Sequence, residues 1–298
     1  MEPHWDDLKC FLAVAREESL SGAGKALKLD PATVGRRIAR LERDMGALLF
    51  TRSPQGYVLT GEGQRLHGHV ARAEAAMSEA LADLAGHGAG LSGQIRVGAP
   101  DGSANFLLPQ VCSEISAANP ELEIQIVALP RIFNLSKREA DMAITVSRPE
   151  TGRLIVRELT DYKLHLAASE DYLARHGPIG RMEDLKGHRI VGYIPDMIFD
   201  RELDYLSGKG FERVALASNS VSVQINWIRQ GGGVGVIHDF ALPAAPGVRK
   251  ILTGEFSLTR TFYLIRHEDD RRVERLNRFA ELLSDGVKRE VARLERMV

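Results

Sequence analysis

Cysteine is nearly absent from this chain, whose 298 residues include only Cys10 and Cys112. The two lie far apart, show no zinc-site spacing and have apolar neighbours. Two isolated thiols build neither a disulfide framework nor a tetrahedral metal centre. We therefore expect buried free thiols, no metal and no cofactor.

Long apolar runs are lacking too, since no stretch approaches the ~18 residues that cross a bilayer. The first residues, 1–7, have neither the basic region nor the apolar core of a secretory signal. We expect a cytoplasmic protein with no membrane partner. With 44% hydrophobic and 27% charged residues the composition is that of a globular protein, and 298 residues suffice for about two domains.

Catalytic motifs are equally scarce. The chain contains neither GxSxG nor HExxH, so no catalytic residue is predicted. Gly231–Gly235 resembles a dinucleotide loop, but His238 replaces its third glycine and the order of helix and strand is reversed, so we expect a helix-ending turn. The turn 267–270, His-Glu-Asp-Asp, is expected to be a charged surface rather than a metal site.

Net charge is −1, yet residues 25–52 contain seven lysine and arginine residues against three acids. Within this basic stretch, Asp30 is a suitable N-cap and Pro31 suits the first turn of a helix. Apolar residues at i, i+4 and i+7 form one face of that helix, and arginines repeat on the other. Alone, this pattern is most often a solvated surface; its context favours a DNA-binding helix.

The preceding segments supply that context. Residues 8–15 have the spacing of an amphipathic helix, and Ser21 is the expected N-cap of a short helix, Gly22–Leu27. A three-residue turn, 28–30, separates it from the basic helix, which is typical of a helix-turn-helix. Residues 51–59, with Pro and Gly between two short β-prone pieces, predict a hairpin wing.

Thr60 is the expected cap of a long helix that ends near Leu84. Its apolar residues alternate spacings of four and three, at Leu66, Val70, Ala73, Met77, Ala80 and Leu84. This seam favours pairing with a second copy over packing on its own domain. A Gly-rich linker, 86–93, follows.

Beyond the linker, short apolar strands alternate with helices, which predicts an α/β domain with largely parallel sheets. The expected strands are 95–99, 123–129, 142–146, 163–168, 189–193, 214–217, 234–237 and 261–265. The expected helices are 106–118, 169–176, 200–208, 221–229 and 271–298.

The order of these features resembles LysR-type transcriptional regulators. The resemblance is carried by residues 11–15 (FLAVA), 19–27 (SLSGAGKAL), 33–42 (TVGRRIARLE), 48–52 (LLFTR) and 59–63 (LTGEG), and it continues at 93–98, 107–109, 119–120, 141–144 and 231–235. Most members have Ser at the position of Gly35, and the family usually places Pro one position after Pro31. Loss of that hydroxyl either brings the backbone closer to DNA or weakens binding.

The resemblance implies an all-α winged helix-turn-helix domain plus an α/β effector domain of two subdomains, like a periplasmic binding protein with a ligand cleft. We predict a DNA-binding domain 1–60, a linker and dimerisation helix 61–86, a hinge 87–92 and an effector domain 93–298. Subdomain one would comprise 93–161 and 265–298, and subdomain two 162–264. Family members usually form tetramers built from two dimers.

For DNA, we assign base-edge or groove contacts to Thr33 and Arg36 and phosphate contacts to Arg37, Arg40 and Arg52. Pro31 and Ala32 begin the helix where groove contacts concentrate, and Gly35 lies among them.

For the effector, Pro100, Asp101 and Ser103 lie between a strand and a helix, where a ligand cleft forms. By resemblance, Leu129, Thr145, Ser147, Tyr193 and Ser220 face the same cleft. Asp101 would repel a carboxylate, which favours a neutral or amine-bearing effector.

The leading hypothesis is a sequence-specific, DNA-binding transcriptional regulator modulated by a small-molecule effector. Its partners would be double-stranded DNA, the effector and a second copy of the chain. Two alternatives are a cytosolic solute-binding or sensor protein without direct promoter control and an enzyme with an N-terminal oligomerisation domain. The basic N-terminus opposes the first, and the absent catalytic motifs oppose the second.

Overall fold

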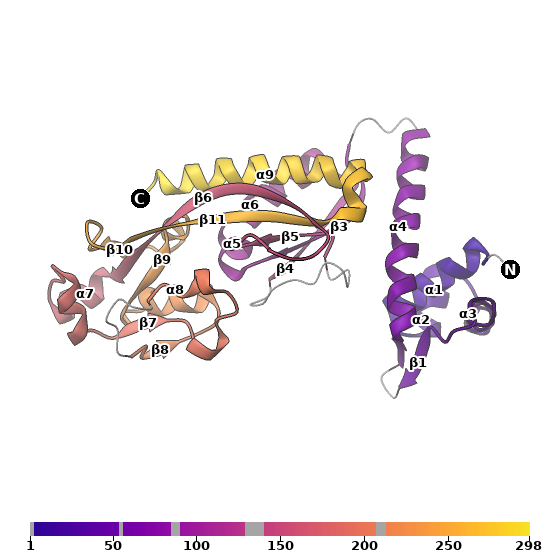
Figure 1. The fold of residues 1–298 in the computed structure, drawn as a ribbon, viewed down its shortest axis with the longest axis horizontal. Helices are drawn as coiled ribbons and strands as arrows, with labels where there is room; N and C mark the ends of the chain where they lie inside the picture. Colours follow the sequence, from indigo (N-terminus) through magenta and orange to yellow (C-terminus); the bar gives the residue numbers. More distant parts are fainter. Residues whose placement is uncertain (1–2, 54–55, 85–89, 129–139, 207–212) are drawn as a thin grey trace. The chain divides into compact units, whose positions relative to one another are not determined.

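The structure is a computed structural model that describes residues 3–53, 56–84, 90–128, 140–206 and 213–298. The chain divides into two compact units, Met1–Gly88 and Ala89–Val298. Each is described by itself below (Figure 1).

The first unit is a three-helix cluster followed by a hairpin and a long helix. Its elements are α1 (Trp5–Glu17), α2 (Leu20–Leu27), α3 (Pro31–Met45), β1 (Phe50–Ser53), β2 (Gly56–Leu59) and α4 (Gly61–Leu84). Phe11, Val34 and Leu41 are fully buried in its core. β1 and β2 pair antiparallel, so the predicted helix-turn-helix and wing are both confirmed.

Helix caps explain where α2 and α3 begin. The Asp30 side chain accepts from Ala32 N at 2.9 Å, as expected, and Pro31 follows as the first helical residue. The expected cap Ser21 was wrong, because α2 begins two residues earlier than predicted and Ser19 accepts from Gly22 N at 2.9 Å. A left-handed Lys28, with φ of 56°, ends α2 and opens the turn.

The seam of α4 divides between two environments. Thr60 Oγ1 accepts from Gly63 N at 3.0 Å, which confirms the cap. Leu66 and Val70 pack into the first unit's own core, whereas Met77 is 53% exposed. The side chains of Ala80 and Leu84 lie outside the described residues. Pairing through α4 therefore stays a prediction that rests on the outer part of the seam.

The second unit is built on one sheet of nine strands in the described residues, in the order β4-β3-β5-β11-β6-β9-β7-β8, with β10 beside β6. The strands are β3 (Gly93–Ala99), β4 (Leu122–Ala128), β5 (Met142–Thr145), β6 (Leu154–Ser169), β7 (Ile190–Gly192), β8 (Leu216–Ala217), β9 (Val234–His238), β10 (Val248–Ile251) and β11 (Ser257–His267).

The expectation of largely parallel pairing was wrong. β3 pairs in parallel with β4 and β5, and β7 with β8 and β9. β11 runs antiparallel to β5 and β6, and β6 antiparallel to β9 and β10. The sheet is mixed because the two long strands β6 and β11 form an antiparallel ribbon through its middle. The predicted subdomain boundaries, 161/162 and 264/265, fall inside these strands; the subdomain division itself stays a prediction.

Helices cover this sheet, and α9 lies along β6 (Figure 1). They are α5 (Asp101–Phe106), α6 (Leu108–Ala118), α7 (Glu170–His176), α8 (Val221–Arg229) and α9 (Glu274–Glu295). Phe279, Leu283 and Val287 of α9 are fully buried. The helix expected over 106–118 is two helices separated at Leu107, and that expected over 200–208 is only a short 3-10 turn, Arg201–Leu203, its last residues lying outside the described part.

Candidate DNA-reading surface and effector cleft

The outer face of α3 carries the residues predicted to read bases. Val34 and Ile38 point into the core, while Pro31, Ala32 and Arg36 are exposed. Arg36 Nη2 donates to Thr33 Oγ1 at 3.0 Å, so the two predicted base-reading residues are neighbours one helical turn apart. In the described residues Arg36 has no acidic partner, which leaves its charge available to DNA.

Arg40 and Arg37 lie on the side of α3 that faces α1. Arg40 Nε donates to Asp7 Oδ2 at 2.6 Å, and a second bond joins its Nη2 to Asp7 Oδ1. These hydrogen bonds raise the pKa of Arg40, although 46% of its side-chain surface stays exposed. Arg37 Nη1 lies 3.4 Å from Asp6 Oδ2. Sequence analysis missed both acids, because they are some 30 residues from their partners.

Gly35 lies where α2 and α3 cross. A Cβ added there would meet Leu20 Cδ1 of α2 at 3.3 Å, so the absent side chain points at the neighbouring helix. Glycine thus permits the close approach of the two helices. Its predicted contact with DNA can involve only its backbone, and it stays a prediction.

Arg52 lies in β1, where its backbone pairs with Tyr57 of β2. Its side chain lies outside the described residues, as does the predicted effector residue Leu129.

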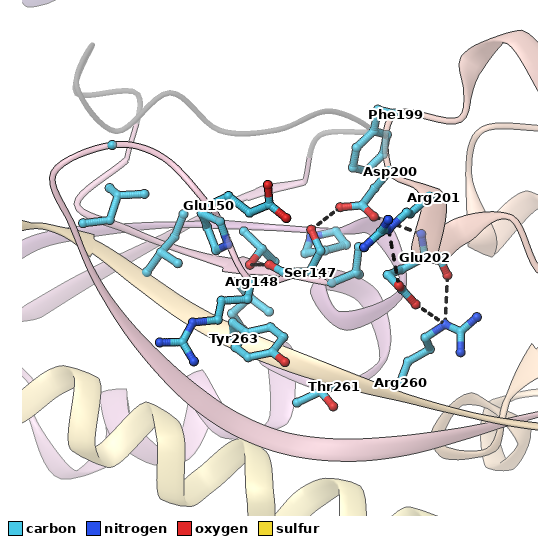
Figure 2. Close-up of a pocket in the computed structure, with 18 of the residues that line it drawn as sticks. Ser147, Arg148, Glu150, Phe199, Asp200, Arg201, Glu202, Arg260, Thr261 and Tyr263 are labelled. Atoms are coloured by element: carbon cyan, nitrogen blue, oxygen red, sulfur yellow. Dashed lines mark hydrogen bonds and ion pairs between the residues drawn. The ribbon is translucent and has the colours of Figure 1, made fainter.

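The second unit contains a cavity of about 1260 Å³ (Figure 2). It opens between the end of β5, the segment that leads into β6, the 3-10 turn at 201 and the strand β11. Three predicted effector residues, Pro100, Thr145 and Ser147, line it. Its remaining polar lining includes Arg148, Glu150, Asp200, Arg201, Glu202, Thr259, Arg260, Thr261 and Tyr263.

Charged groups in this cavity are partly paired with one another. Ser147 Oγ donates to Asp200 Oδ2, and Arg260 Nε lies 2.7 Å from Glu202 Oε2 (Figure 2). In the described residues the side chains of Arg148, Glu150 and Asp200 form no ion pair. The lining therefore offers the unpaired cation of Arg148 and the unpaired carboxylates of Glu150 and Asp200, which a ligand with both charges, or a neutral polar ligand, can satisfy.

The other predicted effector residues gather at a second, much smaller cavity of about 20 Å³, lined in part by Asp101, Ser103 and Tyr193. Its volume is that of about one water molecule. Asp101 Oδ2 accepts from Ser222 N at 2.9 Å, Ser222 Oγ at 3.0 Å and Ser220 Oγ at 3.2 Å. The carboxylate thus satisfies the first turn of α8 from outside that helix. The structure brings Asp101 and Ser220 together as partners of each other.

Aromatic side chains back this small cavity. His238 stacks on Tyr162, which stacks on Phe262 at 4.0 Å. Burial lowers the pKa of His238 from 6.5 to about 4, so the ring is neutral at pH 7. Burial raises the pKa of Tyr162, Tyr193 and Tyr205, so these phenols stay protonated.

Comparison with known families gives two matches that together span most of the chain. The model for the bacterial regulatory helix-turn-helix protein, lysR family, matches residues 5–64, and that for the LysR substrate binding domain matches residues 70–288. The chain belongs to the LysR family. It is a DNA-binding transcriptional regulator with an effector-binding domain.

Individual relatives agree with this assignment. The chain is 26% identical over 238 residues to the HTH-type transcriptional regulator PtxR of Pseudomonas aeruginosa, covering 78% of this chain and 76% of that protein. It is 29% identical over 261 residues to DgdR of Burkholderia cepacia, covering 80% and 79%.

Solved structures share the fold. Neisseria meningitidis CrgA matches with a TM-score of 0.60 at 23% identity, covering 95% of this chain and 98% of CrgA. Full-length LysG from Corynebacterium glutamicum, solved with bound effector Arg, matches with a TM-score of 0.64 at 22% identity, covering 96% and 98%.

Three residues of the large cavity were not predicted from the sequence. Asp200, Glu202 and Arg260 line the large cavity, yet no motif marks them, since they come from a 3-10 turn and a distant strand.

In the described residues no group of histidine, cysteine or acidic side chains could hold a metal. Among the described helices, none has the length and apolarity that a membrane span requires.

Proposed function

We propose that this regulator reads DNA with the outer face of α3. Arg36 and Thr33 address base edges, Pro31 and Ala32 line the groove, and the backbone of Gly35 approaches the DNA. Arg37, Arg40 and Arg52 contact phosphates, which fix the register of the helix without reading sequence. The observation that supports this proposal most is the exposed Arg36, which lies opposite the buried stripe of α3 and has no acidic partner in the described residues.

The test is binding-site selection from a randomised duplex library with the wild-type regulator and with Arg36→Ala. We expect Arg36→Ala to lose preference at one base pair of each half-site, because an arginine paired with guanine contributes about 1–3 kcal/mol of discrimination. Arg43→Ala removes the same charge from the exposed side of α3 and is the matched control. An unchanged preference in Arg36→Ala would refute the assignment.

We further propose that a small molecule binds in the 1260 Å³ cavity and alters the DNA-bound state. Asp101 already occupies the N-terminal turn of α8, so a carboxylate effector would meet a like charge there. Arg148 and Glu150 in the cavity favour a neutral or amine-bearing molecule, including a zwitterion. The known complex of LysG with the amino acid Arg belongs to that chemical class. A thermal-shift screen of amino acids, amines and sugars identifies the ligand, since binding to the folded state raises its midpoint.

We propose that the regulator acts as a dimer paired through residues 61–86, and as a tetramer of two such dimers. The exposed Met77 on α4 supports this arrangement. The regulator would act on promoter DNA in the cytoplasm and carry no catalytic activity of its own, as expected for a relative of transcriptional regulators such as PtxR.

A further inference from the structure

A buried acid on α1 is bound to an arginine on the DNA-facing helix. Asp7 is fully buried, and its carboxylate takes two hydrogen bonds from Arg40 of α3. Among the described residues, Arg40 is its only ionic partner. Because a buried carboxylate is costly without a paired cation, this contact keeps the Arg40 guanidinium at the α1–α3 junction.

Asp7 nevertheless accepts from only part of the Arg40 guanidinium. A guanidinium has five N–H groups in a rigid fork. Asp7 engages Nε and one hydrogen of Nη2, so both hydrogens of Nη1 and the second hydrogen of Nη2 remain. The side chain keeps 46% of its surface exposed. The remaining edge therefore presents two parallel donors to solvent, which is the geometry that a phosphate accepts.

We propose that Asp7 is a positioning residue for DNA recognition, which fixes the Arg40 guanidinium so that its free edge meets one DNA phosphate. This inference rests on the proposed role of α3 as the DNA-reading helix. Asp7 also neutralises the charge of Arg40, so the contact between Arg40 and the phosphate orients α3 on the DNA more than it attracts the DNA electrostatically. Orientation matters only on DNA where α3 is seated in register, whereas attraction acts on any sequence.

Because Asp7 orients Arg40 but also cancels its charge, we expect Asp7→Asn to affect binding to specific and to scrambled DNA differently. The substitution keeps the shape of the side chain but removes the negative charge and one acceptor. Binding to a scrambled duplex becomes tighter at low salt, because a charge that opposed DNA is lost. Binding to the selected duplex gains less, because the guanidinium is no longer held. We expect the ratio of selected to scrambled affinity to fall about tenfold.

Asp44→Asn is the matched control. Asp44 is half-buried on the same helix near Arg40, and it forms no ion pair in the described residues. Its removal changes the net charge equally and should leave the affinity ratio within about twofold. A fall in the ratio for Asp7→Asn alone separates positioning from charge.

The experiment measures dissociation constants of the full chain on a duplex selected by the wild-type regulator and on a scrambled duplex of the same composition, across salt concentrations. Arg40→Lys is the second variant, because it keeps the cation beside Asp7 but lacks the fork. It should lower the ratio without tightening scrambled binding. In the Arg40→Lys background, Asp7→Asn should lower the ratio no further, whereas a purely structural role would lower it again.

Three results would overturn the proposal: an Asp7→Asn ratio equal to that of Asp44→Asn, an Arg40→Lys ratio equal to the wild-type ratio, or a further fall in the ratio when Asp7→Asn is added to Arg40→Lys. If Asp7→Asn does not fold, Arg40→Lys decides alone. A failure of the proposed function would appear in a different experiment. Binding-site selection with Arg36→Ala tests whether α3 reads DNA, whereas Asp7→Asn and Arg40→Lys test only how Arg40 is positioned.

Discussion

At the residue scale, His238 shows how burial sets a protonation state. The ring lies among Tyr162, Tyr205 and Phe240, and burial lowers its pKa to about 4. Its Nδ1 has no hydrogen-bond partner within the described structure. A charged ring there would lack both solvent and a second hydrogen bond, so the native state holds it neutral.

This environment predicts an acid-sensitive effector domain. Below pH 6.5 His238 is protonated in the unfolded chain, whereas in the folded chain it becomes protonated only near pH 4. The free energy of unfolding therefore keeps the full contribution of the neutral His238 above pH 6.5 and falls by roughly 3 kcal/mol as the pH is lowered toward 4. His238→Phe should flatten this part of the pH profile. Urea unfolding followed by Trp227 fluorescence, in a Trp5→Phe background, measures it.

The exposed His4 supplies the control, because His4→Phe removes a histidine from the other unit and should leave the slope of that profile unchanged. A His238→Phe variant that loses stability between pH 6.5 and 4 as steeply as wild type would contradict the burial argument.

At the element scale, Asp101 joins two helices from different parts of the chain. It lies at the start of α5 and accepts three hydrogen bonds from Ser220 and Ser222 at the start of α8. The first turn of α8 has N–H groups without partners in their own helix, and a negative charge is favourable there. The contact therefore ties the turn after β3 to the turn before α8, at the small cavity.

We expect Asp101→Asn to loosen the first turn of α8. Hydrogen bonds to charged groups contribute roughly 1.5–3 kcal/mol each, and the amide retains only part of them. Amide exchange at Ser222 and Val223 should accelerate, while exchange in the centre of α9 should not change. Asp171→Asn, an exposed acid in the first turn of α7, is the control. Equal protection of α8 in wild type and Asp101→Asn would show that the contact is not formed in solution.

The elements also show what sequence can and cannot predict. The helix-turn-helix followed from residues 8–60 because its caps, turn and apolar spacing are local, as with Asp30 and Ala32. The ribbon β6–β11 did not, because pairs such as Ser257 and His165 are far apart in the chain and only parts of each strand are continuously apolar. The cavity residues Asp200, Glu202 and Arg260 were missed for the same reason. Their proximity exists only after the sheet has formed.

At the scale of the whole molecule, the outer part of α4 is the predicted pairing surface. Met77 is exposed on the seam, while Leu66 and Val70 on the same seam are used by the first unit's own core. Met77→Lys should raise the dimer dissociation constant at least about tenfold, because a charge replaces apolar contact at an a/d-type position. Sedimentation velocity over a range of concentrations measures this.

Gln64→Lys adds the same charge to the exposed, off-seam side of α4 and should leave the oligomeric state unchanged. Identical sedimentation of Met77→Lys and wild type would place the pairing surface elsewhere.

We expect ligand binding in the large cavity and DNA binding by α3 to be coupled in this regulator. The most direct measurement is a pair of titrations with a ligand found by thermal shift: DNA affinity and footprint with and without ligand, and ligand affinity with and without DNA. We expect the ligand to change the DNA affinity or the footprint, and any factor by which it changes the DNA affinity to appear equally in the effect of DNA on the ligand affinity. The cavity variant Arg148→Ala should weaken binding of the ligand and leave DNA binding in the absence of ligand unchanged. A ligand that stabilises the folded chain yet changes neither DNA affinity nor footprint would show that the cavity and α3 are not coupled.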